Sequence, residues 1–106
     1  MMQAIISENK VDENGNPTGG SVEGTGIKIV WQDGPLGRGS DRREPNGAFV
    51  EGVIAAALQR IKFYNASKFV CRENSIAATK LEEALLWLNS RTQDREKREV
   101  EGTHVA

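Results

Sequence analysis

The sequence predicts an α+β protein in which a small N-terminal antiparallel sheet precedes a two-helix antiparallel hairpin. Short β-branched and aromatic runs occupy residues 3–7 and 27–32, and the turn signals Asn14-Gly15 and Gly19-Gly20 lie between them. A length of 106 residues favours a single domain. Its expected parts are a sheet over 1–33, a loop over 34–46, a first helix over 47–65, a second over 72–97 and a tail over 98–106.

In the second strand run, Ile27, Ile29 and Trp31 alternate with polar or smaller neighbours. One face of the sheet is therefore apolar, and we expect a helix to cover it. The glycine- and proline-rich stretch GPLGRGSDRREPNG follows and ends at Asn46, whose side chain is suited to cap the first helix.

Two amphipathic repeats identify the helices. The first stripe is Val50, Val53, Ile54, Ala57, Leu58, Ile61 and Tyr64, and the second is Ala77, Leu81, Ala84, Leu85 and Leu88. The second helix also carries Ile76, Leu86 and Trp87 away from its stripe. This is more apolar surface than one hairpin and a small sheet need to cover, so we expect an oligomer, most simply a dimer of this chain.

Composition excludes several classes of function. Fourteen basic and fifteen acidic residues give no overall attraction to DNA, RNA or a membrane surface. Cys71 and His104 are each the only residue of their type, so no disulfide, thiolate zinc site or paired metal ligands are expected. No apolar run is long enough for a secretory signal or a membrane span. No catalytic constellation is present, and we expect neither enzymatic activity nor a cofactor.

Arginines continue the stripe of the second helix. Leu88, Arg91 and Arg95 are spaced three and four residues apart, so the apolar face becomes cationic. Two interpretations stay open: a solvated helix end, or a clamp whose guanidinium groups bind phosphate. The loop also contains three arginines, Arg38, Arg42 and Arg43. Two interpretations apply to it as well: a flexible loop, or a loop that closes over an anion.

The stretch from Phe63 to the end, FYNASKFVCRENSIAATKLEEALLWLNSRTQDREKREVEGTH, resembles the phage Thoeris anti-defence protein one family. The segments IVWQDGPLGRG and PNGAFVE resemble its N-terminal half, so the resemblance covers nearly the whole chain. The most specific parts are the closing VEGTH and the spacing of an aromatic residue, an asparagine and two arginines.

The resemblance implies a sponge that captures cyclic ADP-ribose isomers (glycocyclic ADPR) made by bacterial TIR-domain defence enzymes, without cleaving them, in the cytoplasm of the infected host. By position, the family's aromatic falls on Tyr64, where this chain has tyrosine in place of phenylalanine and Phe63 beside it. Its asparagine falls on Asn74, and its diphosphate-binding arginines fall on Arg91 and Arg95. Some family members form hexamers and hold cyclic di- or trinucleotides at a second site, which maps to no definite residues here.

Helical spacing adds a constraint to these positions. Asn74 and Arg91 are seventeen residues apart, or roughly 25 Å along a helix. One chain therefore cannot place all the residues around one small ligand, whereas two chains with antiparallel second helices form two equivalent pockets. The alternatives are a small helical-hairpin regulator that binds DNA or another protein, and a phosphoesterase that destroys the signal.

Overall fold

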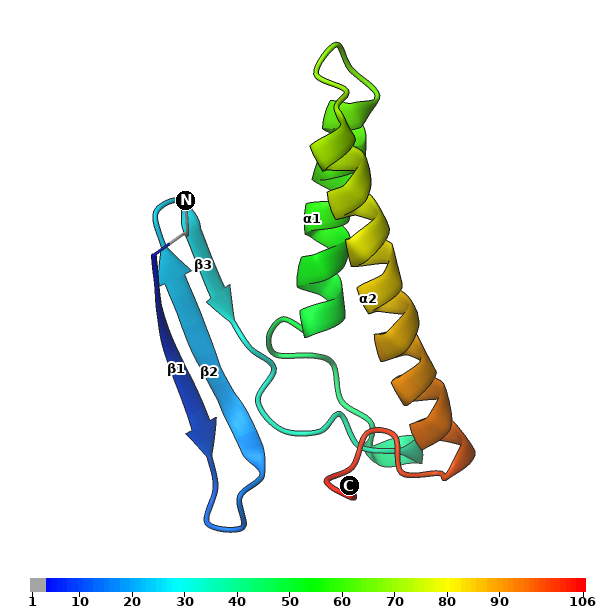
Figure 1. Cartoon of the computed structure of the whole chain (residues 1–106). Coiled ribbons are helices and arrows are strands. Elements are labelled where there is room, and N and C mark those ends of the chain that lie inside the picture. The colour runs from blue at the N-terminus through cyan, green and yellow to red at the C-terminus, as the bar shows by residue number, and fades with distance from the viewer. Residues whose placement is uncertain (1–3) are drawn as a thin grey trace. The chain divides into compact units, whose positions relative to one another are not determined.

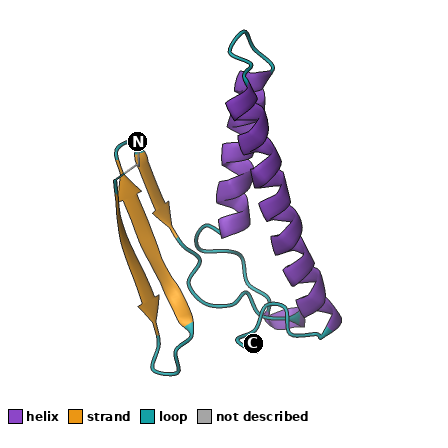
Figure 2. Ribbon diagram, in the orientation of Figure 1, coloured by secondary structure: helices purple, strands orange, loops and turns teal. Residues whose placement is uncertain are grey.

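A computed structural model describes residues 4–106 and divides them into two compact units. The sheet unit contains the residues up to Phe49 together with the tail Val100–Ala106, and the helical unit is Val50–Glu99. Figure 1 labels the strands and the α-helices, and Figure 2 colours the chain by type of secondary structure. The predicted α+β class is confirmed by the three-stranded antiparallel sheet and the two helices after it.

The sheet has the order β1-β2-β3, with every neighbouring pair antiparallel. Its strands are β1 (Ile5–Val11), β2 (Pro17–Gly24) and β3 (Ile27–Val30). Residue 3, the first of the predicted N-terminal run, lies outside the described residues. The strand β2 is a difference from the prediction, which treated much of this segment as a turn.

The close approach of two backbones explains why β2 is rich in glycine. Gly20 has φ of +142°, a region that L side chains rarely adopt, and a Cβ there would collide with the Glu8 carbonyl oxygen on β1. Gly20 also accepts a hydrogen bond from the Trp31 amide at 3.0 Å, so it is paired on its other edge. Gly19-Gly20 is therefore strand backbone that permits close pairing, and its prediction as a turn was wrong.

The other predicted turn, at Asn14-Gly15, is present between β1 and β2. The Asp12 carboxylate accepts hydrogen bonds from the amides of Asn14 at 2.8 Å and Asn16 at 3.0 Å, while Gly15 adopts φ of +79°. The bonds to the Asn16 amide, its side chain and the Asn14 amide lower the pKa of Asp12 below its usual value of 3.8. The turn is thus held by a charged side chain.

The segment after the loop lies along β3. The Ala48 amide donates to the Val30 carbonyl at 2.7 Å, and the Gln32 amide donates to the Ala48 carbonyl at 2.9 Å. The side chain of Asn46 bonds to the amide of Asp33 at 2.8 Å and to its carbonyl at 3.1 Å. The prediction that Asn46 caps the first helix was wrong, because this side chain is used inside the sheet unit.

The helices α1 (Val50–Asn65) and α2 (Arg72–Lys97) form the predicted antiparallel hairpin (Figure 1). Asn65 connects the two sides of the turn: its Oδ1 accepts from the Cys71 amide at 3.0 Å and its Nδ2 donates to Ser75 Oγ at 2.9 Å. Cys71 caps the N-terminus of α2, with its Sγ accepting from the Asn74 amide at 3.4 Å. Lys62 on α1 and Glu82 on α2 add an ion pair at 3.1 Å.

The contact between α1 and α2 buries few side chains. Leu58 is the single buried residue among those described, and Val53, Ile54 and Ile61 are half-buried around it. The other members of the predicted α1 stripe, Val50, Ala57 and Tyr64, are exposed. One partner helix therefore covers only part of the apolar surface of α1.

Candidate functional site

An aromatic pair with an arginine lies near the C-terminal end of α1. The rings of Phe63 and Tyr64 have centroids 6.0 Å apart and planes tilted by 57°. The Arg60 guanidinium carbon is 4.8 Å from each ring centroid, a cation–π distance to both. The spacings of three and four residues place all three side chains on one face of α1. Both rings are substantially exposed, Phe63 at 54% and Tyr64 at 41%.

A shallow groove adjoins Phe63. It has a volume of about 480 Å³ and is lined by α1 alone, through Ala55, Leu58, Gln59, Lys62 and Phe63. Phe63 therefore borders both an open groove and the Arg60 guanidinium. Aromatic surface of this kind is suited to stacking against a planar base.

Asn74 lies in the first turn of α2, at the same end of the hairpin as the aromatic pair. Its backbone N–H donates to Cys71 Sγ, and its side-chain Nδ2 donates to the Phe69 carbonyl at 3.4 Å. This last bond is long, so the side-chain amide is weakly held. Its Oδ1 atom accepts no hydrogen bond from residues 4–106. Asn74 is half-buried and can offer both a donor and an acceptor to a ligand.

Arg91 and Arg95 lie one helical turn apart in the C-terminal half of α2. Arg95 is half-buried and continues the seam positions Leu88 and Thr92, whereas Arg91 is exposed beside that seam. Within residues 4–106, Arg91 makes no ion pair. Trp87, which is 71% exposed, precedes Arg91 by one turn on the same face. An aromatic side chain and two guanidinium groups thus form a row along α2.

The hairpin keeps these two groups of residues apart. Phe63, Tyr64 and Asn74 lie at the turn, and Arg91 follows Asn74 by seventeen residues of continuous helix. At 1.5 Å per residue this separation is roughly 25 Å. The structure therefore places the aromatic and asparagine positions at the same end of the hairpin, and the two arginines together further along α2, but it does not gather all of them in one chain.

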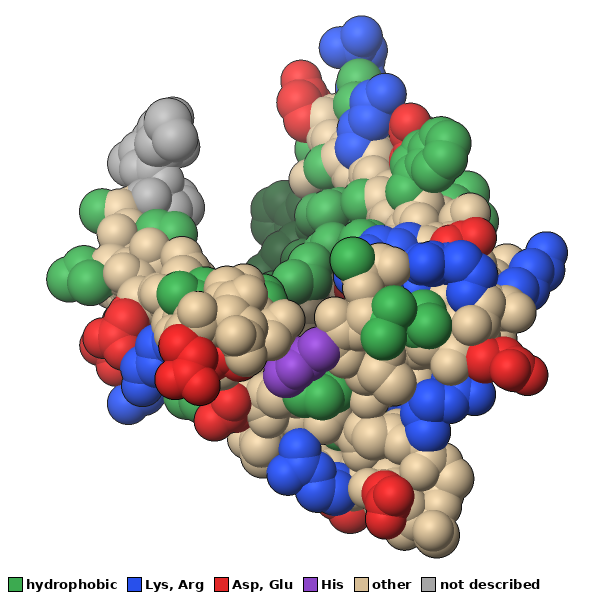
Figure 3. All heavy atoms as spheres, turned by 90° about the horizontal axis from the view of Figure 1, so that it is seen from below, with side chains coloured by type: hydrophobic (Ala, Val, Ile, Leu, Met, Phe, Trp, Pro, Cys, Tyr) green, Lys and Arg blue, Asp and Glu red, His purple; other side chains and the backbone are tan. Residues whose placement is uncertain are grey.

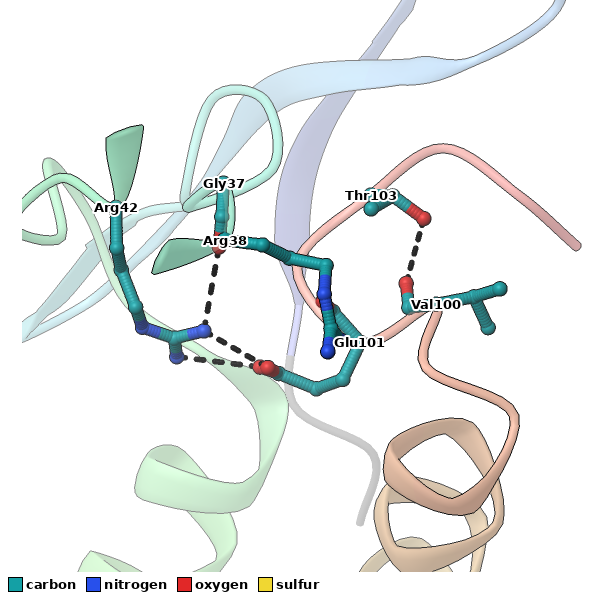
Figure 4. Close-up of polar contacts among 6 residues, drawn as sticks. All are labelled: Gly37, Arg38, Arg42, Val100, Glu101 and Thr103. Carbon is teal, nitrogen blue, oxygen red and sulfur yellow. Dashed lines mark hydrogen bonds and ion pairs between the residues drawn. The ribbon is translucent and has the colours of Figure 1, made fainter. Parts of the chain in front are cut away.

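Two of the loop arginines, Arg38 and Arg42, are bound by the tail within the sheet unit (Figure 4). The Arg42 guanidinium makes two hydrogen bonds to the Glu101 carboxylate, at 2.7 and 3.1 Å. Arg38 donates to the Glu101 carbonyl at 3.1 Å, and Arg43 donates to the Pro35 carbonyl at 2.9 Å. An anion at this loop would have to compete with these contacts, so the loop is tied to the tail.

Two glycines allow that connection. The Gly37 amide donates to the Gly102 carbonyl at 2.9 Å, and Gly102 has φ of +79°. A Cβ on Gly102 would collide with the Gly37 carbonyl oxygen. The sequence segments GPLGRG and VEGTH, far apart along the chain, are therefore fitted to each other.

His104 is exposed in the tail, and the single histidine is visible at the surface in Figure 3. No group of three potential metal ligands occurs within residues 4–106. Neither described helix combines the length and hydropathy needed to cross a bilayer.

Comparison with known protein families identifies the family of the chain. A sequence model described as the Acb2/Tad1 hairpin domain matches residues 23–93, about two thirds of the chain. The chain belongs to this family. The matched region contains the whole α1–α2 turn and Arg91, and it ends just before Arg95. The resemblance inferred from the sequence is thereby confirmed.

A protein named Thoeris anti-defense 1, from Bacillus phage SBSphiJ7, is similar over 59 residues with 56% identity. These residues are 56% of this chain and 42% of the phage protein. The match thus spans less than half the length of that relative.

Sequence reasoning missed two parts of this arrangement. Arg60 was not a candidate, although its spacing of three and four residues from Phe63 and Tyr64 is a signal for contact on a helix. The fit of VEGTH against the loop was also missed, because it depends on contacts between segments about sixty residues apart.

Proposed function

We propose that the protein sequesters cyclic ADP-ribose isomers (glycocyclic ADPR) intact, in two equivalent pockets shared between two copies, and so counters bacterial TIR/Thoeris defence in the host cytoplasm. The observation that carries the proposal is the roughly 25 Å of continuous helix between Asn74, at the same end of the hairpin as the aromatic pair, and Arg91. Membership of the Acb2/Tad1 hairpin family and the name of the phage relative support an anti-defence role.

Helix geometry supports the shared pocket. When two copies pack with their α2 helices antiparallel, the turn of one copy lies beside Arg91 and Arg95 of the other. The two-fold axis makes the second pocket identical to the first. Each pocket then combines an aromatic surface and Asn74 from one chain with two guanidinium groups from its partner.

Exposed apolar side chains support such packing. Ile76, Leu86 and Trp87 on α2 are 42%, 70% and 71% exposed in the single chain. Burying a large apolar side chain contributes about 1.5–3 kcal/mol. A contact between α2 helices that covers these residues would stabilise the dimer and fix the distance between the pocket halves.

The pocket chemistry matches a dinucleotide-like ligand. The adenine face is suited to the Phe63–Tyr64 surface, and the diphosphate is suited to the planar donor sets of Arg91 and Arg95. Each charged hydrogen bond contributes about 1.5–3 kcal/mol net. Sequestration at nanomolar signal levels requires about −12 kcal/mol, and rigid helices reduce the ordering cost of reaching it. A second site for cyclic di- or trinucleotides, in a hexamer, is a further expectation from the family resemblance.

The test begins with wild-type protein and a purified cyclic ADP-ribose isomer. Equilibrium dialysis should show depletion of free ligand, and heating the complex should return the ligand with unchanged mass. A cleaved product would instead indicate a phosphoesterase. Ligand that stays entirely free, together with a shift of duplex DNA that weakens at high salt, would support the regulator.

Arginine variants then test the proposed clamp. Arg91→Ala and Arg95→Ala should each weaken binding by about tenfold or more, because each removes a charged hydrogen bond. Lys80→Ala is the matched control, since Lys80 also lies on α2 and its ion pair with Glu83 is exposed. Normal affinity in both arginine variants would show that the diphosphate is bound elsewhere.

A further inference from the structure

Arg60 occupies the notch between two aromatic rings. Its guanidinium carbon is equidistant from the Phe63 and Tyr64 centroids, at 4.8 Å, while the centroids themselves are 6.0 Å apart and the rings are tilted. The guanidinium therefore lies against both rings at once. Within residues 4–106 it has no carboxylate partner, and its charged group lies against the two rings.

A planar group that is to touch both rings at once must enter this same notch. The guanidinium is itself planar and stacks on aromatic faces, so it fills the position that a base would take. The charge of Arg60 is not neutralised by the rings, and a phosphate is a stronger partner for it than an exposed aromatic face.

We propose that Arg60 is a ligand-binding residue that exchanges partners: a purine displaces its guanidinium from the Phe63–Tyr64 notch, and the released guanidinium binds a phosphate of the same ligand. The inference rests on the proposed function. It adds a third cation to the pocket, beside Arg91 and Arg95, and this cation comes from the chain that supplies the rings. It also makes the choice between Phe63 and Tyr64 unnecessary, because a base in the notch contacts both rings. The site then selects for a purine that carries phosphate over a bare purine nucleoside.

Two probes separate the two halves of the exchange. Adenosine offers a base without phosphate, and linear ADP-ribose offers the same base with a diphosphate. Arg60→Ala should bind adenosine about two- to fivefold more tightly, because the competing cation–π contact is gone. The same variant should bind ADP-ribose about tenfold more weakly, because a charged hydrogen bond to phosphate is lost. Affinities can be measured by calorimetry and, for adenosine, by NMR titration of the Tyr64 ring protons.

Three controls complete the experiment. Lys80→Ala should leave both affinities unchanged, and circular dichroism should show unchanged helicity for Arg60→Ala, since alanine favours a helix and Arg60 is exposed. Arg60→Lys should recover part of the ADP-ribose affinity, because it keeps the charge but loses the planar donor set.

The opposite sign of the two effects is decisive. If Arg60→Ala weakens both probes equally, Arg60 only orients the rings, and the exchange is wrong; unchanged ADP-ribose affinity also overturns it. If wild-type protein binds ADP-ribose but no cyclic isomer, the proposed function fails while the exchange is still tested by the two probes. If it binds the cyclic isomer and Arg60→Ala binds it equally well, the proposed function stands and the exchange fails. Absence of binding to every probe overturns both.

Discussion

Replacing Gly102 by alanine tests whether the tail is fitted to the loop through close backbone contact. Gly102 has φ of +79°, and a Cβ there would collide with the Gly37 carbonyl oxygen and lie 3.2 Å from Arg42 Nη1. Gly26 has nearly the same φ, +76°, but nothing lies within 4 Å of its Cβ position. Gly26→Ala therefore measures the backbone cost alone, and Gly102→Ala measures that cost plus the collision.

The expected magnitudes follow from this difference. A left-handed conformation costs an L-residue about 1–2 kcal/mol, which both variants share. Gly102→Ala should also weaken the Gly37–Gly102 hydrogen bond, worth about 0.5–1.5 kcal/mol, and disturb the Arg42–Glu101 pair, which contributes up to about 1 kcal/mol at this exposure. The tail variant should therefore lose about 1–2 kcal/mol more than its control.

Amide hydrogen exchange at Gly37 gives the most direct measurement. Because about 1.4 kcal/mol corresponds to a factor of ten, protection of this amide should fall roughly tenfold further in Gly102→Ala than in Gly26→Ala. Equal protection in the two variants would refute the reasoning, since the collision would then have no energetic consequence. Protection of amides within α1 and α2 serves as an internal reference in the same spectra.

Two further predictions concern the hairpin turn and the β1–β2 turn. Asn65→Ala should lower the free energy of unfolding of the helical unit by about 1–3 kcal/mol in a denaturant titration, because it removes partners of both the Cys71 amide and the Ser75 hydroxyl; Asn65→Asp keeps the acceptor and should lose less. The pKa of Asp12 is lowered, chiefly by the Asn16 amide, so its stabilising effect is present above its usual value of 3.8 and disappears as pH falls through the lowered folded value. An NMR titration should place the midpoint of the Asp12 carboxyl below 3.8, and a midpoint at or above that value would contradict the hydrogen-bonded turn.

The helical unit could be predicted because its signals are local. Apolar spacing of three and four residues in two runs, with a short break between them, is enough to identify two helices and their hairpin. Exposure could not be predicted in the same way: Ala57 and Tyr64 fit the stripe of α1, yet both are exposed, because α2 contacts a neighbouring part of the helix surface. The rotation of one helix about its axis depends on the helix that packs against it. The apolar spacing within either helix does not determine this rotation.

The strand β2 shows a different limit. Its sequence PTGGSVEG contains a proline and three glycines, a composition that favours turns. The glycine at position 20 is needed because the backbones of β1 and β2 approach closely there, a property of the paired strands and not of β2 alone. The candidate ligand residues could be proposed from resemblance, whereas the Arg60 contact and the bond between Glu101 and Arg42 depend on how side chains are placed in the folded chain.

Mixing two defective variants tests the shared pocket itself. A chain with Arg91→Ala and Arg95→Ala lacks the phosphate half, and a chain with Tyr64→Ala and Asn74→Ala lacks the turn half, so neither should bind as a homodimer. In a mixed dimer, the intact turn of the first variant faces the intact arginines of the second, and the other pocket lacks both halves. After random exchange about half the dimers are mixed, so roughly a quarter of all pockets should recover. A pocket contained in one chain predicts no recovery at any ratio, because every chain in the mixture carries a defect.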